Sequence, residues 1–286
     1  MKIYSYAKIN LIIEILGKFE NGYHNLKGIY QNINLRDEIN INESDHDSVL
    51  LSDSSISEKN NIVYKAIKNF KSTYNLSSSF EITINKRIPI SSGLGGGSSN
   101  ASSVIMAINN ILKLNIPLEE LSLFSSKLGS DLPFFFKGGT CLIKGYGENV
   151  YKLNDVRNRY LYLYDSRISI DNKTQSMFNS LDSSDFTDGK LTEKIKGKIQ
   201  NNEYLNPEDF FNCFQVKALN KFPNLRKKYY QMVEIFGNCF LTGAGMTLIS
   251  MSDKNINSDE FQRTRHYRQS AEQPGACHRG YWHCRG

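Results

Sequence analysis

The sequence predicts a protein of two domains, each of which mixes β-strands with α-helices. The chain has 286 residues, of which 40% are hydrophobic and 22% are charged, enough to build one large core or two modest ones. The first 150 residues contain hydrophobic patterns of the helical period (3.6) and of the strand period (2). The composition changes after Asp155, where an aromatic, strand-like run is followed by a polar, acidic stretch. We therefore place an N-terminal domain at 1–153, a C-terminal domain at 154–260 and an atypical tail at 261–286.

The individual elements follow from hydrophobic periodicity and from Gly, Pro and capping signals. Pro117 begins one helix, because Glu119 and Glu120 then fall in its first turn, where acidic residues suit the helix dipole. Residues 238–249 indicate a strand, a Gly-Ala-Gly turn and a second strand. The other predicted strands are 3–16, 29–41, 80–84, 140–144 and 159–164, and the other predicted helices are 60–74, 98–112, 190–200 and 207–220.

The positive charge of the chain is concentrated in the tail. The formal net charge is +6, but residues 261–286 contain five Arg and one acid, which leaves only +2 for residues 1–260. A nearly neutral body argues against a nucleic-acid or membrane-surface partner. The tail has no Lys, whereas the first 260 residues have 24 Lys and six Arg, so we expect the tail to be non-native or disordered.

No segment of the sequence indicates export, membrane insertion or a disulfide framework. There is no run of 18 apolar residues, and Asn10 and Glu14 interrupt the apolar N-terminus. The five Cys are irregularly spaced, so we expect a cytoplasmic protein. The tail segment CHRGYWHC could be read as a zinc site, but four ligands within eight residues leave little room for tetrahedral geometry. We therefore assign no metal ligands.

The most informative segment is PISSGLGGGSSNAS, at 89–102, which follows a predicted strand and precedes a predicted helix. Its four glycines let several backbone N–H groups converge, and its serines are good N-cap residues. Converging amides at a helix N-terminus favour a phosphate, whereas a flexible linker, the alternative, does not usually occupy such a place. A Walker A loop requires a Lys after its glycines, and none follows here. A dinucleotide-binding fingerprint needs Gly where this sequence has Ser98, so both of these loop types are excluded.

Two further segments carry ionisable groups suited to proton transfer. Asp131, in LGSDLPFFFKGG, has apolar neighbours that could desolvate it for proton acceptance, although this stretch alone favours an ordinary turn Asp. Lys8 and Asn10 share one face of the first predicted strand. An inward Lys needs a carboxylate or a phosphate partner, whereas an edge-strand Lys does not.

Two more segments are weaker pointers to a ligand. Tyr23 and His24 follow an Asn-Gly turn, where they could hold a flat base, although a lone His more often has a structural role. Gly243 and Gly245 lie between two apolar strands, either in a tight hairpin or in a second glycine loop near a ligand.

Together, five segments resemble the GHMP kinases in order and spacing, from about Tyr4 to Ser250. They are AKINL, NGYHNL followed by the segment from Tyr30 to Asp37, the glycine loop, LGSDLPFFFKGGTCLIKGYGE and LTGAG. The resemblance implies an α+β fold with a ribosomal protein S5 domain 2-like N-terminal domain and a ferredoxin-like C-terminal domain. It also implies ATP as co-substrate, together with Mg²⁺.

The resemblance assigns roles to the residues of these motifs. Asp131 is expected to be the general base and Lys8 to hold it ionised. The cytosine of the acceptor is expected to lie against Tyr23, His24 and Phe178, with Asn10 near the erythritol or diphosphate. The residues expected to wrap the ATP phosphates are Pro89, Ile90, Ser91, Ser92, Gly93, Leu94, Gly95, Gly96, Gly97, Ser98 and Ser99.

The expected reaction is ATP-dependent phosphorylation of the 2-hydroxyl of 4-diphosphocytidyl-2-C-methyl-D-erythritol, a cytidine diphosphate-linked methylerythritol, by a monomer or homodimer. The alternatives are another GHMP kinase, of the homoserine or mevalonate type, and a non-catalytic nucleotide-binding regulator. The sequence departs from the family pattern at Asn100 and Gln215, where acids are commoner, and at Ala244, where Ser or Thr is commoner.

Overall fold

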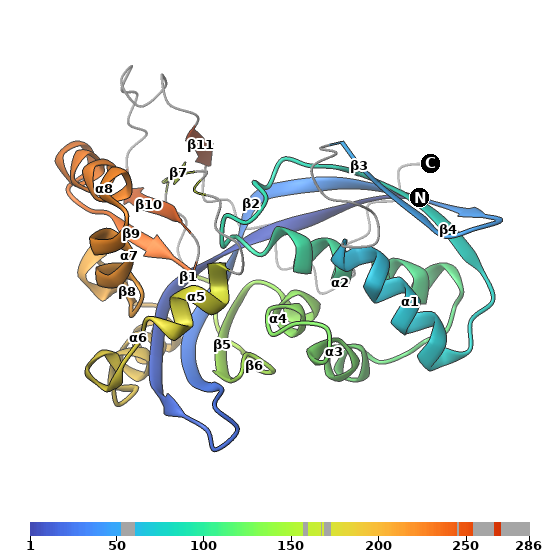
Figure 1. The fold of residues 1–286 in the computed structure, drawn as a ribbon, viewed down its shortest axis with the longest axis horizontal. Coiled ribbons are helices and arrows are strands. Elements are labelled where there is room, and N and C mark those ends of the chain that lie inside the picture. The colour runs from blue at the N-terminus through green and yellow to red at the C-terminus, as the bar shows by residue number, and fades with distance from the viewer. Residues whose placement is uncertain are drawn as a thin grey trace.

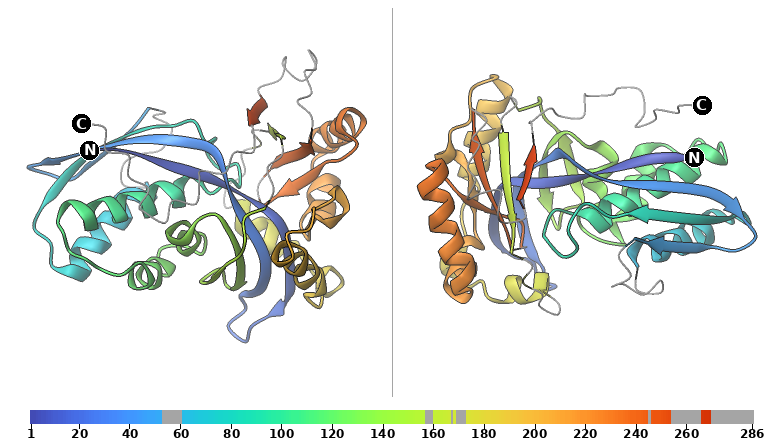
Figure 2. Two further views of the ribbon diagram at one scale, coloured as in Figure 1. Left: turned by 180° about the vertical axis from the view of Figure 1, so that it is seen from behind. Right: turned by 90° about the horizontal axis from the view of Figure 1, so that it is seen from above.

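The computed structural model describes residues 1–52, 61–156, 160–166, 168, 173–244 and 246–253, together with the backbone of a strand at 266–269. It has two β-sheets, each covered by helices, and the second sheet with its helices stands at one end of the long first sheet (Figures 1 and 2). The predicted mixture of strands and helices is therefore confirmed.

The first sheet is built around a long antiparallel hairpin in which Lys8 lies opposite Asn32 and Ile15 opposite Leu26. Its order is β3-β4-β2-β1-β8, with β5 also paired to β2 and β6 to β5. The strands are β1 (Lys2–Lys18), β2 (His24–Ser44), β3 (Ser48–Leu51), β4 (Ser79–Asn85), β5 (Thr140–Gly145), β6 (Asn149–Lys152) and β8 (Phe211–Asn212).

Four helices cover one face of this sheet (Figure 1). They are α1 (Ile62–Tyr74), α2 (Gly96–Ile111), α3 (Leu118–Ser126) and α4 (Leu132–Lys137). In α1, the sequence pattern places Ile62, Ala66, Ile67 and Phe70 on one apolar face; the last three are buried, whereas Ile62 is only half-buried. The Asn61 side chain accepts from the backbone N–H of Val63 at the helix start. These helices place the glycine loop, which leads into α2, over the middle of β1.

The second sheet has the order β11-β7-β10-β9 and is antiparallel throughout. Its strands are β7 (Tyr160–Asp165), β9 (Phe240–Thr242), β10 (Thr247–Ser252) and β11 (His266–Gln269). Its half of the chain also contains α5 (Lys173–Asn179), α6 (Lys190–Gln200), α7 (Gln215–Lys221) and α8 (Pro223–Phe236), and the 3₁₀ turns Ser183–Asp185 and Pro207–Asp209.

The prediction of one helix over 207–220 is wrong. That segment contains a 3₁₀ turn, the short strand β8 and then α7, because β8 pairs in parallel with β1 at Ile12 and Ile13. The Asn212 side chain donates to the carbonyls of Leu241 (2.8 Å) and Gly243 (2.9 Å). The backbone N–H of Cys213 donates to the carbonyl of Ile13 (3.2 Å), a long-range bond that takes the place of a local helical one.

Two expectations concern the ends of the domains. The predicted division at 153/154 separates the two sheets except for β8, which the second half adds to the first sheet. Of the tail, only β11 is described, as a strand paired with β7, and the CHRGYWHC segment lies outside the described residues. None of the helices in the described parts of the chain is long and apolar enough to cross a membrane.

Candidate active site

The structure brings Lys8 and Asp131 together, although 122 residues lie between them in the sequence. The Lys8 ammonium lies 3.5 Å from the Asp131 carboxylate and 4.6 Å from the centre of the Tyr30 ring. Lys8 is buried, whereas the Asp131 side chain is 33% exposed. A buried cation thus faces a carboxylate that is partly open to solvent. Asp131 directly precedes α4, and its place there is set by the buried Leu132 and Pro133.

The glycine loop lies directly against this pair. The backbone N–H of Lys8 donates to the carbonyl of Leu94 (2.9 Å), so β1 and the loop are joined at that point. Gly95 has a φ of +71°, and a Cβ there would lie 2.7 Å from the Phe135 ring and 3.1 Å from the Lys8 side chain. The loop can approach Lys8 and Phe135 this closely only because residue 95 is Gly.

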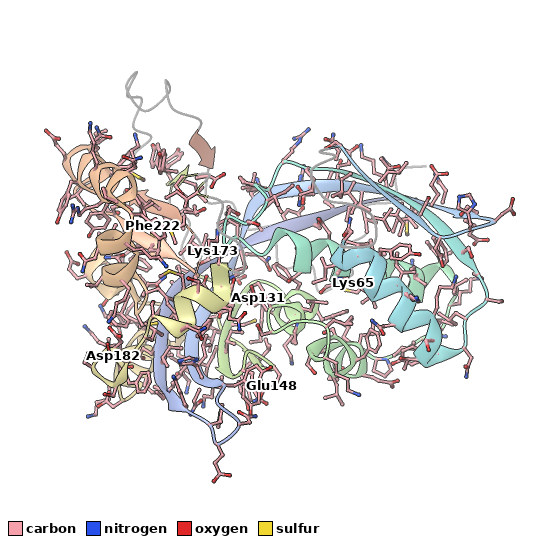
Figure 3. The ribbon with its side chains drawn as sticks, viewed as in Figure 1. Lys65, Asp131, Glu148, Lys173, Asp182 and Phe222 are labelled. Carbon is pink, nitrogen blue, oxygen red and sulfur yellow. The ribbon has the colours of Figure 1, made fainter. Side chains whose placement is uncertain are left out.

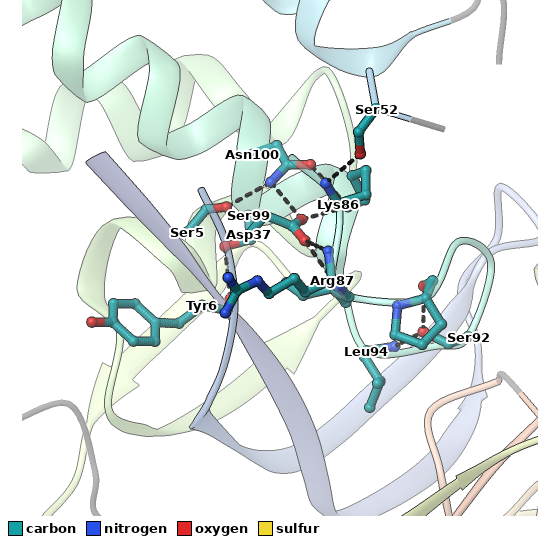
Figure 4. Close-up of polar contacts among 12 residues, drawn as sticks. Ser5, Tyr6, Asp37, Ser52, Lys86, Arg87, Ser92, Leu94, Ser99 and Asn100 are labelled. Atoms are coloured by element: carbon teal, nitrogen blue, oxygen red, sulfur yellow. Dashed lines mark hydrogen bonds and ion pairs between the residues drawn. The ribbon is translucent and has the colours of Figure 1, made fainter. Parts of the chain in front are cut away.

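The start of the loop is held by a buried polar network, which Figure 4 shows. The Asp37 carboxylate pairs with the Lys86 ammonium and accepts from the backbone N–H groups of Arg87 (2.7 Å) and Ile88 (2.8 Å). Asn100 lies between them: its amide donates to Asp37 (2.9 Å) and to Ser5 (2.6 Å), and its oxygen accepts from Lys86 (3.1 Å). A neutral amide can serve both ions, which explains how the departure at Asn100 is accommodated.

The turn between β9 and β10 closes on the other side of the loop. Gly243 has a φ of +62°, and a Cβ there would lie 3.1 Å from the Gly93 carbonyl oxygen and 3.3 Å from the Asn10 side chain. The Thr247 hydroxyl donates to the Ser92 carbonyl (2.8 Å). The LTGAG segment is therefore a second glycine turn beside the loop. Gly245 itself lies outside the described residues.

Asn10 presents unused bonding capacity at the same place. Its side-chain oxygen accepts from the Lys8 ammonium (2.9 Å), and its backbone N–H donates to the Thr242 hydroxyl (2.9 Å). Its amide nitrogen is buried and has no hydrogen-bond partner among the described residues. Burial and the nearby Asp131 carboxylate raise the pKa of Tyr30 well above its usual value, so that Tyr30 stays neutral beside Lys8.

The expected acceptor residues fall into two neighbouring groups. The His24 ring lies 5.0 Å from the Phe178 ring, and its buried Nε2 has no partner among the described residues. Tyr23 is 67% exposed and meets the edge of Tyr146 at 5.6 Å. The next residue, Gly147, packs against Ser130, where a Cβ would lie 2.6 Å from the Ser130 carbonyl oxygen. This contact links the Tyr23 turn to the segment that carries Asp131.

Two residues at the site are absent from the sequence prediction. Tyr146 shares an edge contact with Tyr23 and accepts a hydrogen bond from Asn21 (2.9 Å), and only its place after β5 hinted at a turn. Lys173 donates to the carbonyl of Ser91 in the glycine loop, from α5 in the other half of the chain. No local pattern could reveal that contact, because its partners are 82 positions apart.

Comparison with known proteins identifies the family of this chain. The model of the GHMP kinases N terminal domain matches residues 61–139. A 4-diphosphocytidyl-2-C-methyl-D-erythritol kinase of Clostridium tetani is 34% identical over 253 residues, which cover 87% of this chain and 89% of that protein. One from Thermotoga maritima is 34% identical over 226 residues, 78% of this chain and 82% of that protein. The chain belongs to the GHMP kinase family. Family membership implies ATP as the co-substrate.

The solved structures share the fold of this GHMP kinase. A 4-(cytidine 5'-diphospho)-2C-methyl-D-erythritol kinase superposes with a TM-score of 0.76 at 21% identity, covering 94% of this chain and 98% of that one. The mevalonate kinase of Methanococcus jannaschii superposes with a TM-score of 0.64 at 19% identity, covering 94% and 96%. The α+β fold expected from the resemblance is confirmed. The domain bounds stay a prediction.

Proposed function

We propose that this kinase transfers the γ-phosphoryl group of ATP to the 2-hydroxyl of 4-diphosphocytidyl-2-C-methyl-D-erythritol, a step toward isoprenoid precursors in the non-mevalonate pathway. The names of the curated relatives support this acceptor. The observation that carries the proposal is the Lys8–Asp131 pair, which lies against the glycine loop through the Lys8–Leu94 backbone bond. A proton acceptor and a phosphate-binding loop thus meet at one point.

In the proposed reaction the oxygen of the 2-hydroxyl forms a bond to the γ-phosphorus, and Asp131 accepts the proton of that hydroxyl. The bond from that phosphorus to the bridging oxygen breaks, and ADP leaves. Lys8 pairs with the Asp131 carboxylate and can donate to the attacking oxygen. The loop amides and the start of α2 stabilise the phosphate charge. Phosphoryl transfer requires mainly alignment and charge neutralisation, which these groups supply.

A divalent cation fits this arrangement. Within the described residues there is no cluster of three His, Cys, Asp or Glu side chains that could hold a metal ion. Mg²⁺ is commonly bound through the substrate's phosphates with few protein ligands, so the ATP phosphates at the glycine loop would hold it and Asp131 would stay free to accept the proton. When bound, the cation would neutralise the developing phosphate charge.

The acceptor's base is assigned to the aromatic residues of the β1–β2 turn and α5. His24 and Phe178 present ring faces and an unpartnered ring nitrogen, which suit a flat base with polar edges. Tyr23 extends the same surface. The Asn10 amide, unpartnered among the described residues, is directed to the erythritol or diphosphate part.

The test is an assay of ATP consumption with the cytidylyl acceptor, homoserine and mevalonate offered in parallel. We expect turnover with the first alone. Asp131→Asn should lower kcat by about 10²- to 10⁴-fold, the usual contribution of a general base. Asp188→Asn, in an exposed ion pair with Lys190, is the control and should leave kcat unchanged.

Each alternative would give a distinct result in this assay. Turnover of homoserine or mevalonate in place of the cytidylyl acceptor would overturn the proposed acceptor and leave the kinase assignment. ATP binding without turnover of any acceptor would favour a regulator. A near-normal rate in Asp131→Asn would refute Asp131 as the base.

A further inference from the structure

Lys173 is a buried cation that contacts the glycine loop from the second half of the chain. It is the first residue of α5 and is only 8% exposed. Its ammonium donates to the carbonyl of Ser91, in the segment expected to wrap the ATP phosphates. Figure 3 labels Lys173 and Asp131 in the region where the two halves of the molecule meet.

Three described lysines contact the loop, and Lys173 differs from the other two in its partners. The Lys8 ammonium lies 3.5 Å from Asp131, and the Lys86 ammonium pairs with Asp37. Among the described residues, Lys173 has no carboxylate within 4.0 Å, and its polar partner is a neutral carbonyl. Burial lowers the pKa of Lys173, and the more distant charge of Asp165 only partly opposes this shift.

A buried ammonium without a counter-charge is costly, and proteins retain one chiefly where an anion completes the site. Lys173 reaches the loop at Ser91, whereas Lys8 reaches it at Leu94 and Gly95. Between these points lie Ser92 and Gly93, which face the β9–β10 turn through Thr247 and Gly243. The two lysines therefore contact the loop at opposite ends of this short stretch.

We propose that Lys173 binds the phosphate groups of the nucleotide, exchanging the Ser91 carbonyl for phosphate oxygens when ATP enters. The inference rests on the proposed ATP-dependent function and adds a residue from α5 to the loop. A Lys ammonium acts on phosphate as a point charge, and a charge-assisted hydrogen bond is about twice as strong as a neutral one. The phosphate would also supply a counter-charge, which no described carboxylate within 4.0 Å of the Lys173 ammonium provides.

The test uses Lys173→Gln, which keeps an N–H donor for Ser91 but lacks the charge. We expect the Kd of a non-hydrolysable ATP analogue and of ADP to rise by about 10-fold or more, as for loss of a hydrogen bond to a charged group. Adenosine should bind as it does to the wild type. Lys173→Arg should recover most of the affinity, and Lys190→Gln, an exposed α6 lysine (86%), should change nothing.

The outcomes separate the inference from the proposed function. If the wild type turns over ATP and Lys173→Gln binds the analogue normally, Lys173 is only a tether and the inference is wrong. An equal loss of affinity for adenosine and ATP in Lys173→Gln would likewise indicate a distorted loop and overturn it. If the wild type consumes no ATP with any acceptor, the proposed function fails, whereas loss of nucleotide binding in Lys173→Gln would still support the phosphate contact.

Discussion

At the scale of single residues, His24 is informative because its bonding capacity is unused. Its Nε2 is buried without a partner among the described residues, and its ring lies beside Phe178. Burial lowers the pKa of His24, and the positive charge of Lys18 lowers it further, so that the imidazole is neutral at pH 7. A neutral imidazole offers one donor and one acceptor, which a base edge with an amine and a carbonyl can satisfy.

His24→Phe keeps the ring contact with Phe178 and removes both nitrogens. We expect the acceptor KM to rise by about 10-fold, as for loss of one hydrogen bond, with little change in the KM for ATP. Because the pKa of His24 lies below the ordinary imidazole value of 6.5, the wild-type acceptor KM should rise only at pH values below 6.5, where His24 takes up a proton. Initial-rate measurements between pH 5 and 8 test both points.

The matched control is His46→Phe, at an exposed position beyond the end of β2. It should leave the acceptor KM and its pH dependence unchanged. An unaltered KM in His24→Phe, or a low-pH rise that persists in that variant, would contradict the role given to the imidazole.

Residues identified by a motif were predictable, and residues identified only by a distant partner were not. The glycine loop carries its own signal, because four closely spaced glycines lie between a strand and a helix, although Gly95 stands at the N-cap and not one of the predicted serines. Asp131 read alone is an ordinary turn residue, and the role proposed for it depends on Lys8, which only the fold brings to 3.5 Å. Lys173 carried no signal, since its partner Ser91 lies 82 positions away.

At the scale of elements, the start of the glycine loop is held by a buried ion pair between Asp37 of β2 and Lys86, which directly follows β4. Asn100 of α2 is hydrogen-bonded to both of these residues. Asp37 is fully buried, and its carboxylate serves the Lys86 ammonium, two backbone N–H groups and the Asn100 amide. Removing one partner of a buried ion pair lowers the free energy of unfolding by more than the intact pair contributes to it, because the other charge is left buried and uncompensated. The network therefore fixes where the loop leaves β4 and where α2 begins.

Asp37→Asn leaves the Lys86 ammonium buried without a carboxylate. We expect the free energy of unfolding to fall by about 3–5 kcal/mol, measured by urea denaturation. Adding Lys86→Met removes the stranded charge, so the double variant should be more stable than the sum of the single effects predicts. Additive effects would contradict the coupling.

The exposed pair Lys2–Glu38 provides the comparison for this experiment, with side chains that are 52% and 23% exposed. Lys2→Met should cost no more than about 1 kcal/mol, since surface ion pairs contribute little. A similar cost at both pairs would show that burial is not the deciding factor.

Several elements with a strong local period were predicted, but the amphipathic helix α8 was missed, and so was β8, which is fixed by long-range bonds. The helix predicted at 190–200 is α6 (Lys190–Gln200), and that predicted at 60–74 is α1. The helix predicted from 98 begins at Gly96, because Gly95 takes the left-handed conformation just before it. By contrast, β8 exists because Phe211 and Asn212 pair with β1, which no local pattern encodes.

At the scale of the whole molecule, the site is completed by the contact between the two halves. One hydrophobic cluster contains Ile15 and Phe134 from the first half together with Tyr162 and Leu241 from the second. The two halves are therefore packed through a common core, and the β9–β10 turn is held against the glycine loop. This explains why a body of net charge +2 can serve phosphate-bearing substrates: a few donors are fixed in place, and no basic surface is needed.

A substitution at Gly243 tests whether this contact matters for catalysis. A control glycine with a similar φ but no close neighbours separates the effect of backbone strain from the effect of the contact. Gly237 has a φ of +70°, but a Cβ there would meet nothing within 4 Å, whereas one at Gly243 would lie 3.1 Å from the Gly93 oxygen. Both Gly→Ala variants should lose about 1–2 kcal/mol of stability through left-handed strain. Gly243→Ala should also lower kcat/KM by about 10-fold, since small displacements of reacting groups are costly.

Thermal unfolding and initial-rate kinetics on Gly243→Ala and Gly237→Ala measure the two effects separately. Equal losses of stability with a loss of kcat/KM only in Gly243→Ala would support the contact between the halves. If both variants kept the wild-type kcat/KM, the packing of Gly243 against Gly93 would not be needed for catalysis. If both lost it equally, the cause would be strain alone, because Gly237 lies at the end of α8, without neighbours for its Cβ.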